Sequence, residues 1–394
     1  MLGFNPPAAA ADSSPPESLE DLGTAEEYLV RLFRVLSSRD AHVSSMAAEG
    51  GQCPENALTA LERAAKTPAT VNEARRLLEH PTPLVRALAA AVLTTAGERG
   101  SEVQREMKWA IQQCPQQFAH LLPAREPEDL SNAVVLGTMI TIQPDEQVVH
   151  PTMLYRRGGW EPVFEGPVVA PSRWRPALGK PQPFQTKTKA VHAGWNCDAT
   201  GWVLPVVGPA PEPRQGLVLA GKLESRPIPE APAELQSAIQ GALKAHAPDE
   251  HRLLARYLLA STVDTEKDPT TIWTAAGQPH DTRSWCLPTS RSEWLCRAQQ
   301  RRELRDTQGS GVESQQSCLS LFWLRGNSSA MRILQSSREC APPFDDNSGE
   351  EPLWALKLEG RDYWLIGETL GTALWEPRTA GVRHVGSFSS GYCD

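Results

Sequence analysis

The sequence predicts an α+β protein, with an N-terminal α-helical domain followed by a mostly antiparallel β region. That β region carries an inserted helical hairpin and ends in a disulfide-braced C-terminal β subdomain. Three observations support this fold class. Apolar residues recur at helical spacing up to about residue 113. Beyond about residue 130, short apolar segments alternate with turns rich in Gly, Pro, Asn and Ser. Four of the eight cysteines lie from Cys286 to Cys340, within this turn-rich part.

Composition limits the classes of partner. The 394 residues carry a formal net charge of −8, and the sequence pI is about 5.7. Nucleic-acid binders need a basic footprint, so we expect no nucleic-acid partner. No apolar run reaches the roughly 18 residues that a transmembrane helix needs, so we expect no membrane span. The predicted segments are a disordered Pro/Ala-rich leader (1–22), a helical domain (24–122), a β-rich Trp/Pro domain (133–265) and a disulfide-braced β domain (270–394).

The helical domain begins with a capping box formed by Thr24 and Glu27, followed by an apolar stripe at helical spacing. Further helices are predicted at 55–66, 69–79, 83–96 and 101–113. The segment EARRLLEHPTPLVRALAAAVLTTAG, residues 73–97, resembles one unit of a HEAT-like repeat, with a helix, a His-Pro-Thr-Pro turn and a second helix. Stacked repeats need about three units, and no second copy is visible, so we predict a compact helical domain.

Strands dominate from about residue 133 onward. A first strand pair is predicted at 133–142 and 147–156, and a second pair at 201–208 and 216–223. A helical hairpin is predicted at 232–263, because Pro232 suits a helix start and the apolar pattern repeats after Pro248. Strands resume in the C-terminal part, at 320–325, 331–336, 353–360, 362–368, 372–377 and 382–388.

The cysteines bear on the cellular compartment. The sequence lacks the C-x2-4-C knuckles of zinc sites and the C-x-x-C of redox enzymes. We predict disulfides Cys286–Cys296 and Cys318–Cys340 and an exported protein, periplasmic or extracellular; buried free thiols in a cytoplasmic protein are the alternative. The N-terminus shows neither the basic nor the apolar region of a signal peptide. Its alanine run is then either the tail of a longer signal or part of a disordered leader.

Three weak catalytic or metal-binding candidates stand out. His192 is close enough in sequence to Cys197 to suggest a thiol nucleophile with an imidazole base, although a half-cystine is the simpler reading. His280 and Asp281 would need a serine, and no G-x-S-x-G motif provides one. The acidic turn at Asp345, Asp346 and Glu350 offers oxygen ligands but fails the spacing of a calcium loop. No cofactor motif is present, so we expect no cofactor.

The Pro- and Trp-rich stretch provides the predicted binding surface. Planar aromatic and guanidinium groups on an extended backbone are good contact anchors for a protein or glycan partner. The alternative is that the tryptophans fill gaps beneath the segment and bind nothing; full burial of both rings would exclude the surface. The predicted binding residues are Arg156, Arg157, Trp160, Arg173, Trp174 and Arg175.

These observations favour a non-enzymatic binding or interaction protein. A hydrolase is one alternative, either with Cys197 as nucleophile or with a catalytic triad whose members cannot be assembled from the sequence. A cytoplasmic helical scaffold with buried free thiols is the other.

Overall fold

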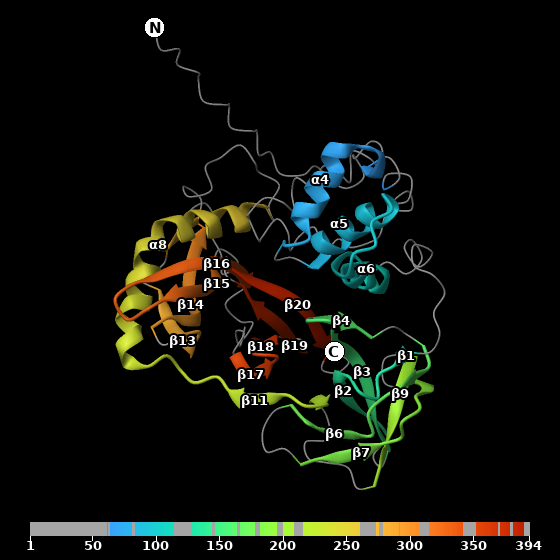
Figure 1. Ribbon diagram of the computed structural model, residues 1–394. Helices are drawn as coiled ribbons and strands as arrows, with labels where there is room; N and C mark the ends of the chain where they lie inside the picture. Colours follow the sequence, from blue (N-terminus) through green and yellow to red (C-terminus); the bar gives the residue numbers. More distant parts are fainter. Residues whose placement is uncertain are drawn as a thin grey trace.

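Figure 1 shows the protein as a computed structural model. The predicted leader 1–22 and the capping box at Thr24 and Glu27 lie outside the described residues. The described residues are 61, 64–80, 83–113, 128–143, 146–163, 166–177, 182–194, 200–208, 216–260, 273–275, 279–290, 292–306, 315–341, 352–368, 371–378 and 381–389.

Among the described residues, three helices form the first layer: α4 (Pro68–Leu77), α5 (Pro83–Thr95) and α6 (Ser101–Gln113). Their bounds are close to the predicted ones. Proline begins both α4 and α5, where its missing N–H would have no partner in any case. The helix α5 is buried from Val85 to Leu93, because it lies between its neighbouring helices and strand β20 (Val382–Ser389).

An eight-stranded antiparallel sheet follows the helices. Its order is β4-β3-β2-β10-β6-β7-β9-β8, and β3 also pairs with β9 through Val148↔Pro205 and Val149↔Leu204. This extra pairing closes six of the strands into a ring, which we call the closed sheet. The strands are β2 (Val134–Gln143), β3 (Glu146–Arg156), β4 (Gly159–Pro162), β6 (Arg173–Pro176), β7 (Phe184–Thr186), β8 (Val191–Gly194), β9 (Thr200–Val207) and β10 (Gly216–Ala220). Beside it lies a short parallel pair, β1 (Glu128–Asp129) and β5 (Val168–Val169).

The strands β9 and β10 were predicted to pair with each other, and that prediction is wrong. The strand β10 pairs with β2 and β6, whereas β9 pairs with β3, β7 and β8. Closure of the sheet separates them, because β6 and β7 complete the ring between them. The inward side chains, including Val135, Leu154, Leu204 and Val218, fill the interior of the closed sheet.

A single helix, α8 (Ala233–Ala260), replaces the helical hairpin predicted at 232–263. Pro248 lies inside this helix, which follows a bent course in Figure 1. Proline removes one backbone hydrogen bond and bends a helix without having to end it. Leu243 before the proline and Leu254 after it both pack on the same sheet, so the chain continues in one direction instead of reversing.

The C-terminal part forms two further antiparallel sheets. The outer sheet, which lies under α8, has the order β12-β14-β15-β16, with β13 also paired to β14. Its strands are β12 (Trp273–Ala275), β13 (His280–Pro288), β14 (Trp294–Asp306), β15 (Gln315–Gly326) and β16 (Met331–Ala341). The central sheet has the order β11-β17-β18-β19-β20, from β11 (Glu224–Pro227), β17 (Pro352–Leu358), β18 (Arg361–Glu368), β19 (Gly371–Pro377) and β20.

The central sheet is apolar on both faces, and this sets the layer order. Trp364 and Ile366 of β18 pack against the outer sheet, together with Trp323. The alternate residues Tyr363 and Leu365 belong to a different core. That core also contains residues of α5, α6 and the outer face of the closed sheet, so helices and both sheets share it.

The sequence predicts a compact helical domain, and in the structure the helices also pack on β strands from two sheets. The domain boundaries themselves stay a prediction.

Candidate interaction surface

The predicted binding residues Arg156 and Arg157 lie at the tip of the β3–β4 hairpin. Arg156 pairs with Gly159, which leaves a two-residue turn of Arg157 and Gly158. Both turn residues have positive φ, 52° for Arg157 and 75° for Gly158, as the tight turns that suit twisted hairpins require. The arginine side chain at the tip is exposed.

The two tryptophans do not project into solvent, so the prediction that they anchor a partner is wrong. Trp160 is 3% exposed and Trp174 is 1% exposed. Trp174 lies inside the closed sheet, where its Nε1 donates to Pro171 O at 2.7 Å and to Thr186 Oγ1 at 3.1 Å. The physical reason is the closure of the sheet, which gives alternate side chains of this extended segment an interior to fill.

The remaining predicted arginines lie elsewhere. Arg173 and Arg175 are on β6, which β10 and β2 separate from β3. Arg175 is turned toward the chain that leads into β11, because its Nη2 donates to Leu223 O at 2.9 Å and its Nη1 to Ser225 Oγ at 3.1 Å. Arg173 is exposed. The structure therefore does not bring the two predicted arginine pairs together.

A second hairpin, β17–β18, packs against the tip of β3–β4. Tyr155 Oη donates to Glu359 Oε2 at 2.9 Å. Arg361 Nη1 donates to Gly158 O at 3.2 Å. Between them, the rings of Tyr155, Trp160 and Tyr363 meet edge to face, with centroids 5.4 to 6.2 Å apart. Burial raises the pKa of both tyrosines, and the hydrogen bond to Glu359 raises that of Tyr155 further, so both hydroxyls stay protonated.

Arginines from four segments gather around these hairpin tips. Arg105 of α6 donates from Nη2 to Arg157 O at 3.3 Å. The carboxylate of Glu376 contacts two more arginines. Its Oε1 lies 3.5 Å from Arg361 Nη1, and its Oε2 lies 2.9 Å from Arg378 Nη2. We call this group the arginine surface; its members are Arg105, Arg156, Arg157, Arg361 and Arg378.

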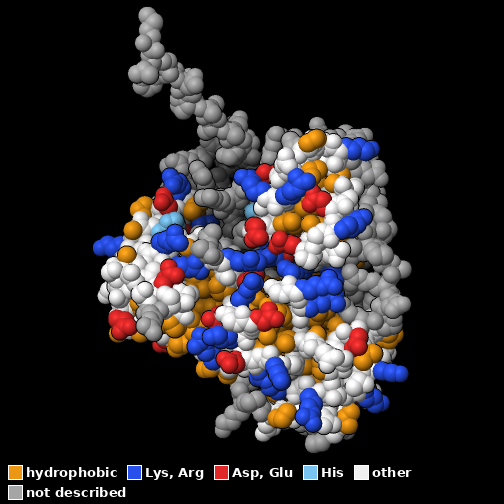
Figure 2. All heavy atoms as spheres, viewed as in Figure 1, with side chains coloured by type: hydrophobic (Ala, Val, Ile, Leu, Met, Phe, Trp, Pro, Cys, Tyr) orange, Lys and Arg blue, Asp and Glu red, His pale blue; other side chains and the backbone are white. Residues whose placement is uncertain are grey.

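Carboxylates lie among the cations of the arginine surface. Lys108 adds a sixth cation, and it shares Glu161 with Arg156. The nearby carboxylates are those of Glu79, Glu161, Glu359 and Glu376. Figure 2 shows basic and acidic side chains together in a band across the middle of this face.

The side chains of this surface remain open to a partner. The side chain of Arg361 is 55% exposed, that of Arg156 is 37% exposed, and that of Arg378 is 35% exposed. In contrast, the carboxylates of Glu161 and Glu376 are almost buried beneath them. Glu79 and Glu359 are exposed at the same face, so a ligand that approaches it meets guanidinium groups and carboxylates together.

A buried ion cluster fixes α6 to the central sheet below this surface. Arg86 Nε lies 3.0 Å from Glu106 Oε2, and Arg383 contacts the other oxygen of the same carboxylate. Arg86 also donates to His384 O at 2.8 Å. Burial lowers the pKa of Arg86 to about 10, although the Glu106 carboxylate opposes the shift. Arg86 thus stays charged at neutral pH and ties β20 to α6, the helix that carries Arg105.

Among the described residues, the predicted catalytic and metal-binding candidates show no catalytic or metal-binding arrangement. His192 is exposed on β8 with its ring 5.7 Å from that of Trp202. Asp281 accepts from Arg283 Nε at 3.2 Å. Within the described ranges, no three His, Cys, Asp or Glu residues are grouped to hold a metal ion. Outside the described residues lie Cys197, Asp345, Asp346 and Glu350, so the thiol nucleophile and the acidic turn stay predictions.

The predicted cysteine pairs lie at bonding distance. The sulfur atoms of Cys286 and Cys296 are 2.08 Å apart, and those of Cys318 and Cys340 are 2.04 Å apart. In each pair the two cysteines lie directly opposite each other on neighbouring strands of the outer sheet.

Sequence reasoning missed Arg105, Arg361 and Arg378. Each occurs in a different element, and no local motif marks it, because only the meeting of α6, β18 and the end of β19 makes them neighbours.

Comparisons with known proteins identify no family. No family model matches the chain, and no curated protein matches it. A solved structure of translation elongation factor SelB from Methanococcus maripaludis, in complex with the GTP analogue GppNHp, is 9% identical over 82% of this chain and 85% of that chain, with a TM-score of 0.19. A TM-score this low carries no argument about fold or function. Among the described helices, none is both long and apolar enough to cross a bilayer.

Proposed function

We propose that this chain is an exported, non-enzymatic binding protein that docks an acidic segment of a protein partner on the arginine surface. The observation that carries the proposal is the gathering of five arginines from four segments on a chain of net negative charge. Arginine is among the residue types that dominate binding hot spots, and its planar fork matches a carboxylate.

The framework beneath these arginines supports binding, because it holds the backbone that carries them in place. The two hairpin tips are joined by hydrogen bonds and by three packed rings. A rigid framework lowers the entropy lost on association. The long side chains still lose freedom, so specificity comes from the spacing of the charges.

A protein partner fits better than a glycan. The glycan hypothesis depended on exposed tryptophan rings that stack on sugars, and both rings of this segment are buried. Carboxylates on a protein segment would instead pair with guanidinium groups and need no aromatic platform. Export is supported by the two disulfides, which persist in oxidising compartments.

Charge reversal at the hairpin tip tests the proposal. Arg157→Glu places a carboxylate at the most projecting position, and Arg173→Glu makes the same change on β6, outside the surface. With a fluorescent oligoglutamate peptide as probe, we expect Arg157→Glu to weaken binding about tenfold or more. The control should stay within about twofold of the unchanged protein. Fluorescence anisotropy at low salt measures both affinities.

Two results would contradict the proposal. One is equal weakening by both variants, which would mean a diffuse charge effect. The other is the absence of any binding to oligoglutamate at low salt, where exposed charges are screened least.

A further inference from the structure

The two disulfides lie on the face of the outer sheet that α8 covers, but their surroundings differ. Cys286 and Cys296 pack under the first half of the helix with Leu235 and Ile239. Cys318 and Cys340 pack under the second half with Leu254.

The first disulfide is enclosed. Both of its cysteines are 0% exposed. Although β13 borders the sheet there, the chain before α8 covers that border. Cys286 N–H donates to Pro229 O at 3.2 Å, and Ala231 N–H donates to Ser284 O at 2.8 Å. A reagent that approached Cys286 from outside the sheet would meet this segment first.

The second disulfide lies at a different border. Cys318 is 0% exposed, whereas Cys340 is only partly buried. Cys340 belongs to β16, which has β15 as its single strand partner within the described part of the chain. A thiolate attacks a disulfide sulfur that it can reach, and the other sulfur leaves. The geometry favours attack at Cys340, with Cys318 as the leaving group.

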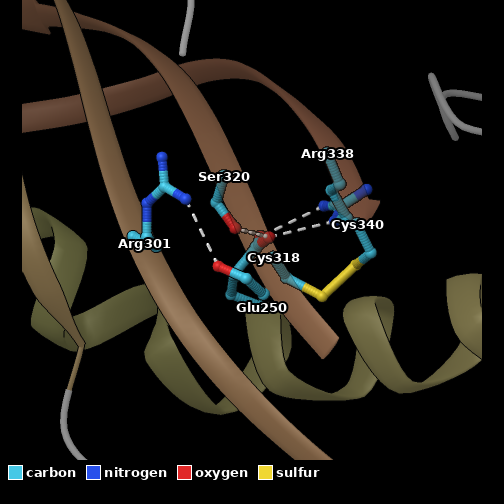
Figure 3. Close-up of a disulfide and its surroundings, with 7 residues drawn as sticks. Glu250, Arg301, Cys318, Ser320, Arg338 and Cys340 are labelled. Carbon is cyan, nitrogen blue, oxygen red and sulfur yellow. Dashed lines mark hydrogen bonds and ion pairs between the residues drawn. A yellow bond between two sulfur atoms is a disulfide. The ribbon is translucent and has the colours of Figure 1, made fainter. Parts of the chain in front are cut away.

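A charged cluster lies beside this disulfide, as Figure 3 shows. The carboxylate of Glu250, on α8, is 2% exposed. Its Oε1 accepts from Ser320 Oγ at 2.7 Å and from Arg338 Nε at 3.0 Å. Its Oε2 accepts from Arg338 Nη2 at 3.2 Å. Burial alone would raise the pKa of Glu250, but His246, Arg338 and Ser320 together hold it below its usual value, so the carboxylate is ionised.

The strand register links the cluster to the disulfide. Cys318 is opposite Cys340, and two residues away on each strand Ser320 is opposite Arg338. Residues two apart on a strand share a face. The disulfide therefore fixes, next to the Glu250 site, the two strands that provide its donors.

We infer that Cys318–Cys340 is a thiol-exchange site whose opening by a dithiol releases the second half of α8. The end of β16 would then lie at the edge of the sheet with no covalent link to β15. Movement of Arg338 away from Glu250 leaves a buried carboxylate without its cation, which strongly destabilises the local packing. The part of α8 beyond Pro248 then loses contacts that hold it on the outer sheet.

The exchange is a two-electron step. One thiolate of the dithiol attacks Cys340 Sγ, the bond between the two sulfur atoms breaks, and Cys318 leaves with the electron pair and takes up a proton. The second thiol of the reagent then attacks the mixed disulfide as a thiolate. Cys340 is released, takes up a proton, and the dithiol ends as a cyclic disulfide.

Graded reduction of the native protein tests the selectivity. The protein is equilibrated with increasing dithiothreitol, its thiols are trapped with iodoacetamide, and each cysteine peptide is quantified by mass spectrometry. We expect Cys318 and Cys340 to be labelled at dithiothreitol concentrations about tenfold lower than Cys286 and Cys296. Opening of both disulfides together, or of Cys286–Cys296 first, would overturn the inference.

Hydrogen exchange tests the release of the helix, on the unchanged protein at the dithiothreitol concentration that opens only the second disulfide. Exchange in residues 250–260 should accelerate about tenfold, while that in 233–245 stays as in the oxidised protein. The double variant Cys318→Ala/Cys340→Ala should show the same pattern without reductant. Unchanged exchange at 250–260 in the reduced protein would show that the bond does not control the helix.

Discussion

Glu106 is the residue that joins the helical layer to the central sheet. Its carboxylate is fully buried and contacts two arginines, Arg86 from α5 and Arg383 from β20. Such a cluster is weak evidence for net stability, but the removal of one partner leaves uncompensated charge in the interior. Two cations pair with this carboxylate, so its loss affects both.

We therefore expect Glu106→Gln to lower the free energy of unfolding by about 3–5 kcal/mol. Glu102→Gln is the matched control one turn earlier on α6. The Glu102 side chain is 38% exposed and lies 3.7 Å from Arg383 Nη1. Its replacement should change stability by about 0–1 kcal/mol. Urea unfolding of both variants gives the comparison, and similar losses would show that the buried cluster has no special role.

His384 makes stability depend on pH. Burial, followed by the nearby charge of Arg86, lowers the pKa of His384 from 6.5 to about 3. Between these two values the unfolded chain binds a proton at this residue and the folded chain does not. Stability therefore falls as the pH falls through this window. Part of the residue remains in contact with solvent, so screening makes the slope shallower than full burial would.

Thermal unfolding measured between neutral pH and about pH 4 checks this expectation. The melting temperature should decline with acidification, and His384→Asn should make that decline smaller. His280→Asn replaces an exposed histidine on β13 and should leave the slope unchanged. A His384→Asn protein with the same slope as the unchanged protein would assign the acid sensitivity to other groups.

At the scale of elements, local sequence predicted most of the pieces. Helices α4 to α6 were predicted because their apolar spacing is contained in each segment. The strands around Val149 and Trp364 were predicted from short apolar runs bounded by turns. The pairing of β9 with β10 was predicted wrongly because adjacency in sequence is only a tendency, and closure through Val149↔Leu204 is a long-range contact.

The helix α8 shows a second limit. The apolar pattern that repeats after Pro248 was taken as the second helix of a hairpin. The sequence cannot distinguish a reversal from a bend, because both place apolar residues on one side before and after the proline. The outer sheet decides between them: it runs under both halves and offers cores for Leu243 and Leu254.

The candidate site was predictable only where its residues are neighbours in the sequence. Arg156 and Arg157 were found because they are adjacent to aromatic residues in the sequence. The burial of Trp160 and Trp174 was not predictable, since extended chains with alternating aromatic residues occur both on surfaces and as strands of a core. Arg361 contacts Gly158, about two hundred positions away in sequence, and no local pattern predicts such a contact.

At the scale of the whole molecule, four layers meet around one central sheet. The helix α8 covers the outer sheet, the outer sheet packs on one face of the central sheet, and the helices and the closed sheet pack on the other. The arginine surface lies where α6 and the two hairpin tips meet, so it exists only when the whole chain is folded.

Arginine footprinting locates the partner-binding surface without a substitution. The native protein is treated with phenylglyoxal, with and without oligoglutamate, and each arginine peptide is quantified by mass spectrometry. Protection by the probe should be confined to Arg105, Arg156, Arg157, Arg361 and Arg378, while Arg173 and Arg252 react equally in both samples. Protection at Arg173 or Arg252, or none at Arg157 and Arg361 under conditions where the peptide binds, would contradict the account.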